Sequence, residues 1–248
     1  MNDLKPISAT DIPDNLLGDA LKNFNISIAI FLTAIVFMAL SLSPMTANAD
    51  INSPVKTQSP ELTIGIIGDS LSAGYGLRQN ESWAHLLSKR LEKSYSGINV
   101  INASVSGATT DAGLQMQAGL LQQQPDILIL ELGANDGLQG KPLSLIKKNL
   151  STLITQAQNS GAEVLLVGIK LPPNLGRRYT EPFFAQFEAL AEQHNTPLVP
   201  FLLEGIAGNP ALMQADGLHP NSAAQGAILE TVWQQLEGLL KQKQRERQ

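Results

Sequence analysis

Residues 62–68 read LTIGIIG, an uncharged and mainly apolar run that leads directly into Asp69 and Ser70. The run is short, rich in β-branched side chains and continuous rather than alternating, which is typical of a strand buried on both faces. Four further short apolar runs follow it along the chain: 98–103 (INVINA), 127–132 (ILILEL), 164–169 (VLLVGI) and 196–201 (TPLVPF). The sequence therefore predicts five strands.

Longer amphipathic segments separate and follow these runs. Patterns with a helical period cover roughly residues 82–95, 110–123, 142–159, 181–194 and 221–241. Strands that alternate with helices in this way predict an α/β fold, with one parallel sheet and helices on both faces. Right-handed crossovers then bring the loops that follow the strands to one edge of the sheet, where ligands bind in such folds.

The composition excludes several classes of protein. The chain has 248 residues, of which 43% are hydrophobic and 16% charged, and its formal net charge is −5. These values argue against a disordered protein or a coiled coil, and there is no basic surplus for binding nucleic acid. Because the chain has no cysteine, disulfides, thiolate metal sites and cysteine nucleophiles are excluded as well.

The N-terminal part has the pattern of an export signal. Residues 26–43 include 14 apolar residues among 18 and no charge, and Ala47 and Ala49 form the small-residue pattern of a signal-peptidase site. We expect cleavage after Ala49 and a periplasmic or secreted enzyme; the alternative is an uncleaved anchor in the inner membrane with the domain facing the periplasm. The expected organisation is a signal peptide or anchor at 1–49, a linker at 50–60, the catalytic domain at 61–240 and a basic tail at 241–248.

Polar residues follow the predicted strands, where the fold places chemistry. Ser70 is the best candidate for a nucleophile, and such a serine needs a base and a group that orients the base. His219 and Asp216 lie three residues apart on one segment, so that one turn can hold them together. The alternatives are a helix-capping serine and a surface histidine. His85 and His194, the other two histidines, lie in helical patterns without a nearby carboxylate in a loop.

An acyl-transfer site also needs donors for the oxyanion. The backbone N–H groups of Ser70 and Gly107 and the side-chain amide of Asn135 are the candidates. Taken alone, Gly107 is also explained by a turn and Asn135 by an Asx-turn. The coincidence of all these residues at strand ends favours catalysis.

Four blocks of the sequence resemble, in order and spacing, those of the SGNH or GDSL hydrolase superfamily: GDSLS at 68–72, Gly107, GAND at 133–136 and DGLH at 216–219. The longer runs GDSLSAGYG (68–76), ELGANDGLQG (131–140) and LPPNLGRRY (171–179) are similar to its bacterial periplasmic branch of acyl-thioesterases, arylesterases and lysophospholipases. Position 72 is serine, so the G-x-S-x-G elbow of α/β-hydrolases is absent.

The resemblance implies a flavodoxin-like, three-layer α/β/α sandwich with a five-stranded parallel sheet. It also implies a triad of Ser70, Asp216 and His219, an oxyanion hole of Ser70, Gly107 and Asn135, and no metal or organic cofactor. The expected activity is hydrolysis of carboxylic esters and thioesters through an acyl-enzyme on Ser70. The expected substrates are small acyl esters, thioesters or lysophospholipids, and the chain is expected to be a monomer that binds no nucleic acid. It would associate with a membrane through residues 26–43 if that segment is not cleaved.

An acyl groove is expected beside segments 109–120 and 171–180. Five leucine and methionine residues are candidates for its lining: Leu114, Met116, Leu138, Leu171 and Leu175. Leu114 and Met116 fit a core position equally well, and Arg177 and Arg178 are either a site for a phosphate or coenzyme head group or a solvated pair. Two other functions are the alternatives. One is a carbohydrate O-deacetylase that uses the same triad. The other is a non-catalytic, membrane-held protein that binds acyl chains or lipid, and the complete triad counts against it.

Overall fold

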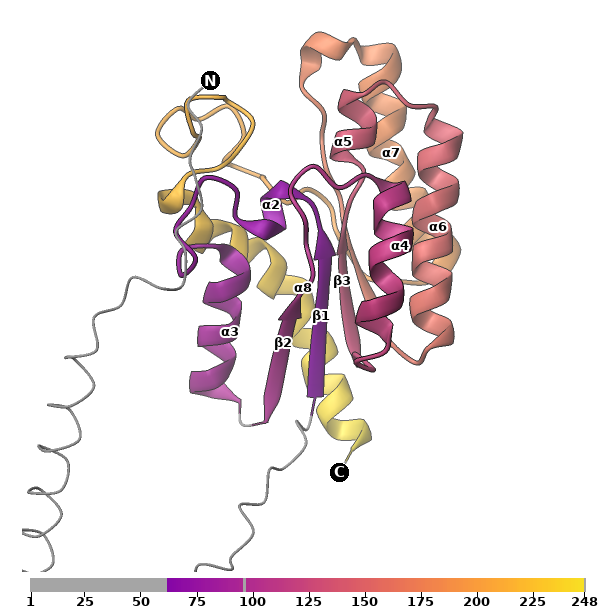
Figure 1. Ribbon diagram of the computed structural model, residues 1–248, viewed down its shortest axis with the longest axis vertical. Coiled ribbons are helices and arrows are strands. Elements are labelled where there is room, and N and C mark those ends of the chain that lie inside the picture. The colour runs from indigo at the N-terminus through magenta and orange to yellow at the C-terminus, as the bar shows by residue number, and fades with distance from the viewer. Residues whose placement is uncertain (1–61, 96, 248) are drawn as a thin grey trace, which may run out of the picture. The chain divides into compact units, whose positions relative to one another are not determined.

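The computed structural model describes residues 62–95 and 97–247, and a five-stranded parallel sheet forms their centre (Figure 1). The strand order is β2-β1-β3-β4-β5, with every neighbouring pair parallel. The strands are β1 (Leu62–Gly68), β2 (Ile98–Asn102), β3 (Ile127–Glu131), β4 (Glu163–Val167) and β5 (Leu198–Val199). The expected leader at 1–49 and linker at 50–60 lie outside the described residues.

Helices cover both faces of the sheet. Helices α3 and α8 pack against each other on one face, and α4, α6 and α7 pack side by side on the other (Figure 1). The helical elements are α2 (Ser70–Ala73), α3 (Trp83–Ser94), α4 (Thr110–Leu121), α5 (Ala134–Leu138), α6 (Leu143–Asn159), η1 (Pro173–Leu175), α7 (Arg177–His194), η2 (Ser222–Ala224) and α8 (Gln225–Glu246). The predicted three-layer α/β fold is confirmed.

Some predicted boundaries were wrong for identifiable reasons. The last strand pairs over only two residues, because Pro197 and Pro200 flank it and cannot donate a ladder hydrogen bond. Helix α7 begins at Arg177 rather than near residue 181. Helix α8 ends at Glu246 rather than near residue 241. The short helices α2 and α5 were not predicted, because one turn is too short to show a periodicity.

The core is formed where both helical layers meet the sheet. Every residue of β1 and β3 is buried, as their continuous apolar runs predicted. Trp83 and Leu87 of α3 and Phe183 of α7 are fully buried against these strands and their neighbours. Burying side chains of this size contributes roughly 1.5–3 kcal/mol each. In the part of the chain that the structure describes, no helix has the length and apolarity needed to cross a bilayer.

Candidate active site

Ser70 lies at the carboxyl end of β1, at the first position of helix α2. Asp69 caps this helix, since its Oδ1 accepts a hydrogen bond from the backbone N–H of Leu71 at 3.0 Å. Gly74 ends the helix after one turn with a φ of +79°, a left-handed conformation that glycine adopts without strain. The sequence between Gly68 and Gly74 therefore forms a tight strand-to-helix turn that presents the Ser70 hydroxyl at the sheet edge.

His219 and Asp216 complete a hydrogen-bonded chain with Ser70. The Nε2 atom of His219 lies 2.8 Å from Ser70 Oγ, and its Nδ1 atom lies 2.6 Å from Asp216 Oδ2. Asp216 Oδ1 accepts hydrogen bonds from the backbone N–H groups of Leu218 at 2.9 Å and His219 at 3.0 Å. In the sequence, Ser70 lies on one segment and Asp216 and His219 on another, and the structure brings the two segments together.

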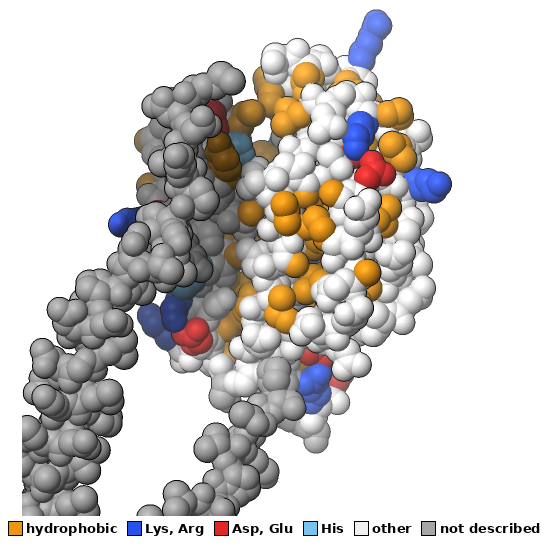
Figure 2. Space-filling view, viewed as in Figure 1, with side chains coloured by type: hydrophobic (Ala, Val, Ile, Leu, Met, Phe, Trp, Pro, Cys, Tyr) orange, Lys and Arg blue, Asp and Glu red, His pale blue; other side chains and the backbone are white. Residues whose placement is uncertain are grey.

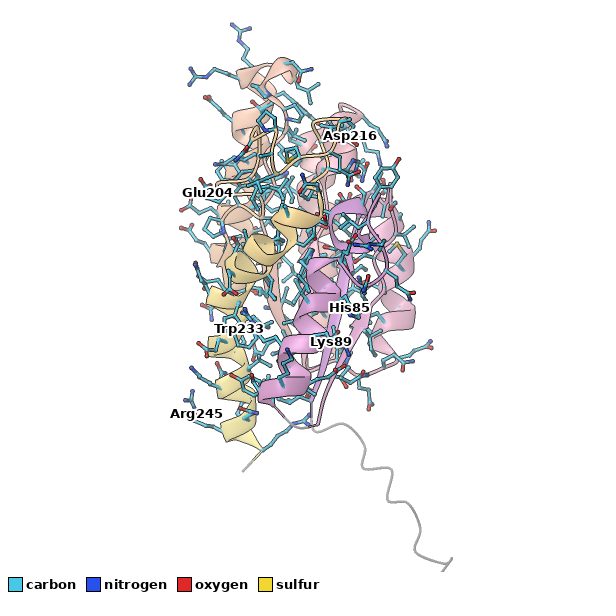
Figure 3. The ribbon with its side chains drawn as sticks, turned by 90° about the vertical axis from the view of Figure 1, so that its left-hand side faces the viewer. His85, Lys89, Glu204, Asp216, Trp233 and Arg245 are labelled. Atoms are coloured by element: carbon cyan, nitrogen blue, oxygen red, sulfur yellow. The ribbon has the colours of Figure 1, made fainter. Side chains whose placement is uncertain are left out.

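The hydrogen bonds that Asp216 accepts keep its carboxyl group ionised. Hydrogen bonds from the backbone and imidazole of His219 and from the Leu218 amide lower the pKa of Asp216 to about 2. Its side chain is 39% exposed, so that solvent also stabilises the charge. Asp216 lies at the end of the domain toward which the strands point, whereas His85, on α3, lies away from this end (Figures 1 and 3). An ionised Asp216 can hold the imidazole with Nδ1 protonated and Nε2 free to accept a proton from Ser70.

Tyr75 and Gln214 support His219, and the sequence analysis missed both. The Tyr75 ring lies 4.6 Å from the imidazole, centroid to centroid. Gln214 Nε2 donates to the carbonyl groups of Tyr75 at 2.8 Å and Pro220 at 3.0 Å, which joins the loops that carry the nucleophile and the base. Tyr75 lies within the run GDSLSAGYG, and its position in that run was the available signal.

The three candidate oxyanion donors lie on three loops at the same sheet edge. Gly107 has a φ of +82°, which favours glycine. No hydrogen bond joins the backbone N–H of Ser70 or Gly107 to another described residue. Asn135 is the second residue of α5, and its Nδ2 donates to Asp69 Oδ2 at 3.2 Å and to the Ala108 carbonyl at 3.0 Å. The amide nitrogen of Asn135 is thus fixed beside both the Ser70 and Gly107 segments.

Asp69 and Glu131 are two buried carboxyl groups behind this site. Asp69 is 1% exposed and Glu131 is 0% exposed. Burial raises the pKa of Asp69 to about 6. Burial, and then the nearby charge of Asp69, raise the pKa of Glu131 well above its ordinary value. Both groups therefore favour the protonated form in the folded protein relative to the unfolded chain.

This shift predicts a pH-dependent loss of stability. Because Asp69 ionises near 3.8 when unfolded and near 6 when folded, its contribution to stability falls as the pH rises through this interval. We expect the free energy of unfolding of the wild type, relative to the Asp69→Asn variant, to fall by on the order of 2 kcal/mol between about pH 4 and pH 7. Urea unfolding at both pH values measures this difference; a difference that does not change with pH would contradict the assignment.

An apolar cleft of about 580 Å³ opens beside Ser70 and His219. Two of the predicted groove residues, Leu138 and Leu171, line it. Most of its other apolar lining comes from the segments that follow β4 and β5 and from the loop before α8: Ile169, Pro172, Pro173, Phe201, Leu203, Ala207, Met213 and Leu218. Pro172 and Pro173 belong to the segment 171–180 that was expected beside the groove. The others were not predicted, although the position of several of them after predicted strands was a usable signal.

The other predicted groove residues do not line this cleft. Leu114 and Met116 lie on α4 and pack, partly buried, against the core, and Figure 2 shows apolar side chains at the surface over this helix. Leu175 is exposed in η1, outside the cleft lining. Arg177 and Arg178 are exposed at the start of α7 and do not line the cleft. The interpretation of Arg177 and Arg178 as a solvated pair therefore fits the structure better than a site for a head group.

Comparisons with known proteins identify relatives of this chain. Residues 66–227 match the model of the GDSL-like Lipase/Acylhydrolase family. Esterase TesA of Pseudomonas aeruginosa is 45% identical over 184 residues, covering 74% of this chain and 92% of that protein. Thioesterase 1/protease 1/lysophospholipase L1 of Escherichia coli strain K12 is 41% identical over 179 residues, covering 72% and 85%. A crystal structure of TesA matches with a TM-score of 0.69 and 46% identity, covering 71% of this chain and 99% of that one.

Proposed function

Since the chain belongs to the GDSL-like lipase/acylhydrolase family, we propose that it is a serine esterase that cleaves ester and thioester bonds through an acyl-enzyme on Ser70. The observation that carries the proposal is the continuous hydrogen-bonded chain from Ser70 Oγ through His219 to Asp216. A serine becomes a nucleophile when a base removes its proton as it attacks, and this geometry provides that base.

In the proposed reaction, Ser70 Oγ attacks the acyl carbonyl carbon while its proton moves to His219 Nε2. The tetrahedral intermediate collapses when that proton passes to the leaving alcohol or thiol, which leaves the acyl group on Ser70. Water then attacks the acyl carbon while its proton moves to His219 Nε2. The bond between the acyl carbon and Ser70 Oγ breaks, that proton returns to Ser70 Oγ, and the free acid departs. Asp216 stabilises the imidazolium that forms in both steps.

A substitution at Asn135 tests the proposed oxyanion hole. Replacing it with alanine removes one side-chain donor and should lower kcat by about 10²–10³ with little change in KM, because the donor acts mainly on the transition state. Steady-state kinetics with a p-nitrophenyl ester measure both constants, and Asn159→Ala at the end of α6 is the matched control. An unchanged kcat would remove Asn135 from the site.

The cleft supports an acyl chain rather than a sugar as the bound group. Its lining beside the triad is mainly leucine, isoleucine, proline and phenylalanine, with Lys170 at one edge. Burial of each methylene contributes up to about 0.8 kcal/mol. The name of the Escherichia coli relative, a thioesterase and lysophospholipase, supports thioesters and lysophospholipids as further substrates. The apolar run at 26–43 and the Ala47-Asn48-Ala49 site support our proposal that the enzyme acts outside the inner membrane.

Acyl chain length separates this function from the carbohydrate alternative. We expect kcat/KM for p-nitrophenyl octanoate to exceed that for the acetate by at least about tenfold. Leu138→Ala, which shortens an exposed lining residue, should reduce this preference, whereas Leu114→Ala on α4 should leave it unchanged. Faster hydrolysis of acetylated oligosaccharides than of the octanoyl ester would instead favour the deacetylase.

A further inference from the structure

Glu131 is a buried carboxyl that the proposed reaction does not use. It is the last residue of β3, and its Oε2 accepts hydrogen bonds from the backbone N–H of Asp69 at 3.3 Å and from Ser72 Oγ at 2.8 Å. A Cβ atom at Gly68 would lie 2.7 Å from the same oxygen, so only glycine leaves room for this contact. Glu131 therefore ties β3 to both sides of Ser70.

Asp69 extends this connection to the oxyanion donors. Its Oδ1 caps α2 at Leu71, and its Oδ2 accepts the hydrogen bond from Asn135 Nδ2. The same Asn135 nitrogen donates to the Ala108 carbonyl, next to Gly107. Hydrogen bonds thus run from Glu131 through Asp69 and Asn135 to the Gly107 loop, and so connect all three segments that carry the candidate donors.

The acceptors around Asn135 determine which end of its side-chain amide faces the site. A side-chain amide can present either its oxygen or its nitrogen to a neighbour. Because Asp69 Oδ2 and the Ala108 carbonyl both accept, they select the orientation in which the NH₂ group of Asn135, rather than its carbonyl oxygen, lies between the Ser70 and Gly107 segments. These two contacts use both amide hydrogens, so one of them has to be shared or released when the oxyanion accepts a hydrogen bond from Asn135. The opposite orientation would place a carbonyl oxygen where the oxyanion forms and would repel it.

Burial of Glu131 carries a cost that packing alone does not explain. Its Oε1 has no hydrogen-bond partner among the described residues. A buried polar atom without a partner costs roughly 1–3 kcal/mol, and an apolar side chain would avoid that cost. The carboxyl is better explained by what its other oxygen holds.

We propose that Asp69 and Glu131 are positioning residues of the oxyanion hole: Asp69 orients the Asn135 amide, and Glu131 fixes the backbone of Asp69 and the hydroxyl of Ser72. The inference rests on the proposed function, because it concerns the donors that stabilise the tetrahedral intermediate. Glu131 is not among the residues that line the cleft, whereas Asp69 lines it beside Ser70; the role proposed for each is to act through its neighbour.

A double-mutant cycle tests Asp69. Asp69→Asn keeps a capping oxygen for Leu71 but turns an amide nitrogen toward Asn135, so kcat should fall by about 10–10² with KM nearly unchanged. In an Asn135→Ala background the same change should cost less than about threefold, because the group on which Asp69 acts is already gone. Multiplicative effects in the double variant would overturn the proposal. An Asn135→Ala variant with full kcat would instead contradict the oxyanion assignment in the proposed function.

Two substitutions test Glu131, one conservative and one apolar. Glu131→Gln keeps an acceptor for Asp69 and Ser72 and should retain kcat within about threefold, whereas Glu131→Leu should lower kcat by at least about tenfold. Gln117→Leu, which alters another buried polar side chain on α4, measures the effect of such a change away from the site. Thermal unfolding identifies any variant that fails to fold, and for such a variant the Asp69 cycle decides. Full kcat in a folded Glu131→Leu variant would overturn the role of Glu131.

Discussion

Replacing Ser70 with alanine should remove essentially all hydrolysis of p-nitrophenyl esters, with a fall in kcat of at least about 10³-fold and up to about 10⁶-fold. Alanine deletes the oxygen that would form the acyl bond, and the hydrogen-bonded His219 then has no proton to accept from the enzyme. The remaining donors can stabilise attack by water only weakly. Ser70 lies in a short turn between β1 and α2, so the domain should fold without its hydroxyl.

A fluorophosphonate probe separates loss of the nucleophile from loss of the fold. The wild type should gain one phosphonyl group per chain by intact-mass measurement, and Ser70→Ala should gain none while unfolding at a similar temperature. Ser144→Ala on the exposed side of α6 is the matched control and should be labelled like the wild type. Labelling of the Ser70→Ala variant, or undiminished turnover, would exclude Ser70 as the nucleophile. A wild type that takes no label would favour the non-catalytic, lipid-binding alternative.

The sheet, and the residues that we propose as the triad, were predictable from the sequence because both leave strong local signals. The run at 62–68 is continuous and apolar, and it forms a strand with every residue buried. Alternation with helices was enough to place Ser70, Gly107 and Asn135 at one edge of the sheet, since parallel strands bring their carboxyl ends together. His219 and Asp216 were recognisable because three residues of spacing allow one loop to hold both.

The cleft and the supporting contacts were less predictable. Leu114 has helical spacing that fits a groove or a core equally well, and only the packing of α4 decides between them. Phe201 and Leu203 line the cleft from an irregular segment after β5, where no periodicity reveals which side chains point inward. The contacts of Glu131 join residues about 60 positions apart, and no local pattern indicates such a pairing.

Replacing His219 with alanine should lower kcat nearly as much as the loss of Ser70, by about 10⁴–10⁶-fold, because the nucleophile and its base act as one unit. Asp216→Asn should cost less, about 10²–10⁴-fold, since it leaves the imidazole and removes mainly its orientation and its counter-charge. The Asp216 side chain is 39% exposed, so water partly replaces the lost carboxylate beside the imidazolium.

The informative result is which variant, His219→Ala or Asp216→Asn, loses more activity. It is obtained from kcat for p-nitrophenyl butyrate hydrolysis at saturating substrate. His85→Ala on α3 is a matched control, because this histidine lies away from the triad and should leave kcat unchanged (Figure 3). The low pKa of Asp216 implies that the carboxylate remains ionised throughout a profile from about pH 5 to 9, so no loss of activity in that range should come from its protonation. A larger loss for Asp216→Asn than for His219→Ala would show that the carboxylate does more than orient the base, and the roles assigned to the two residues would have to be exchanged or shared.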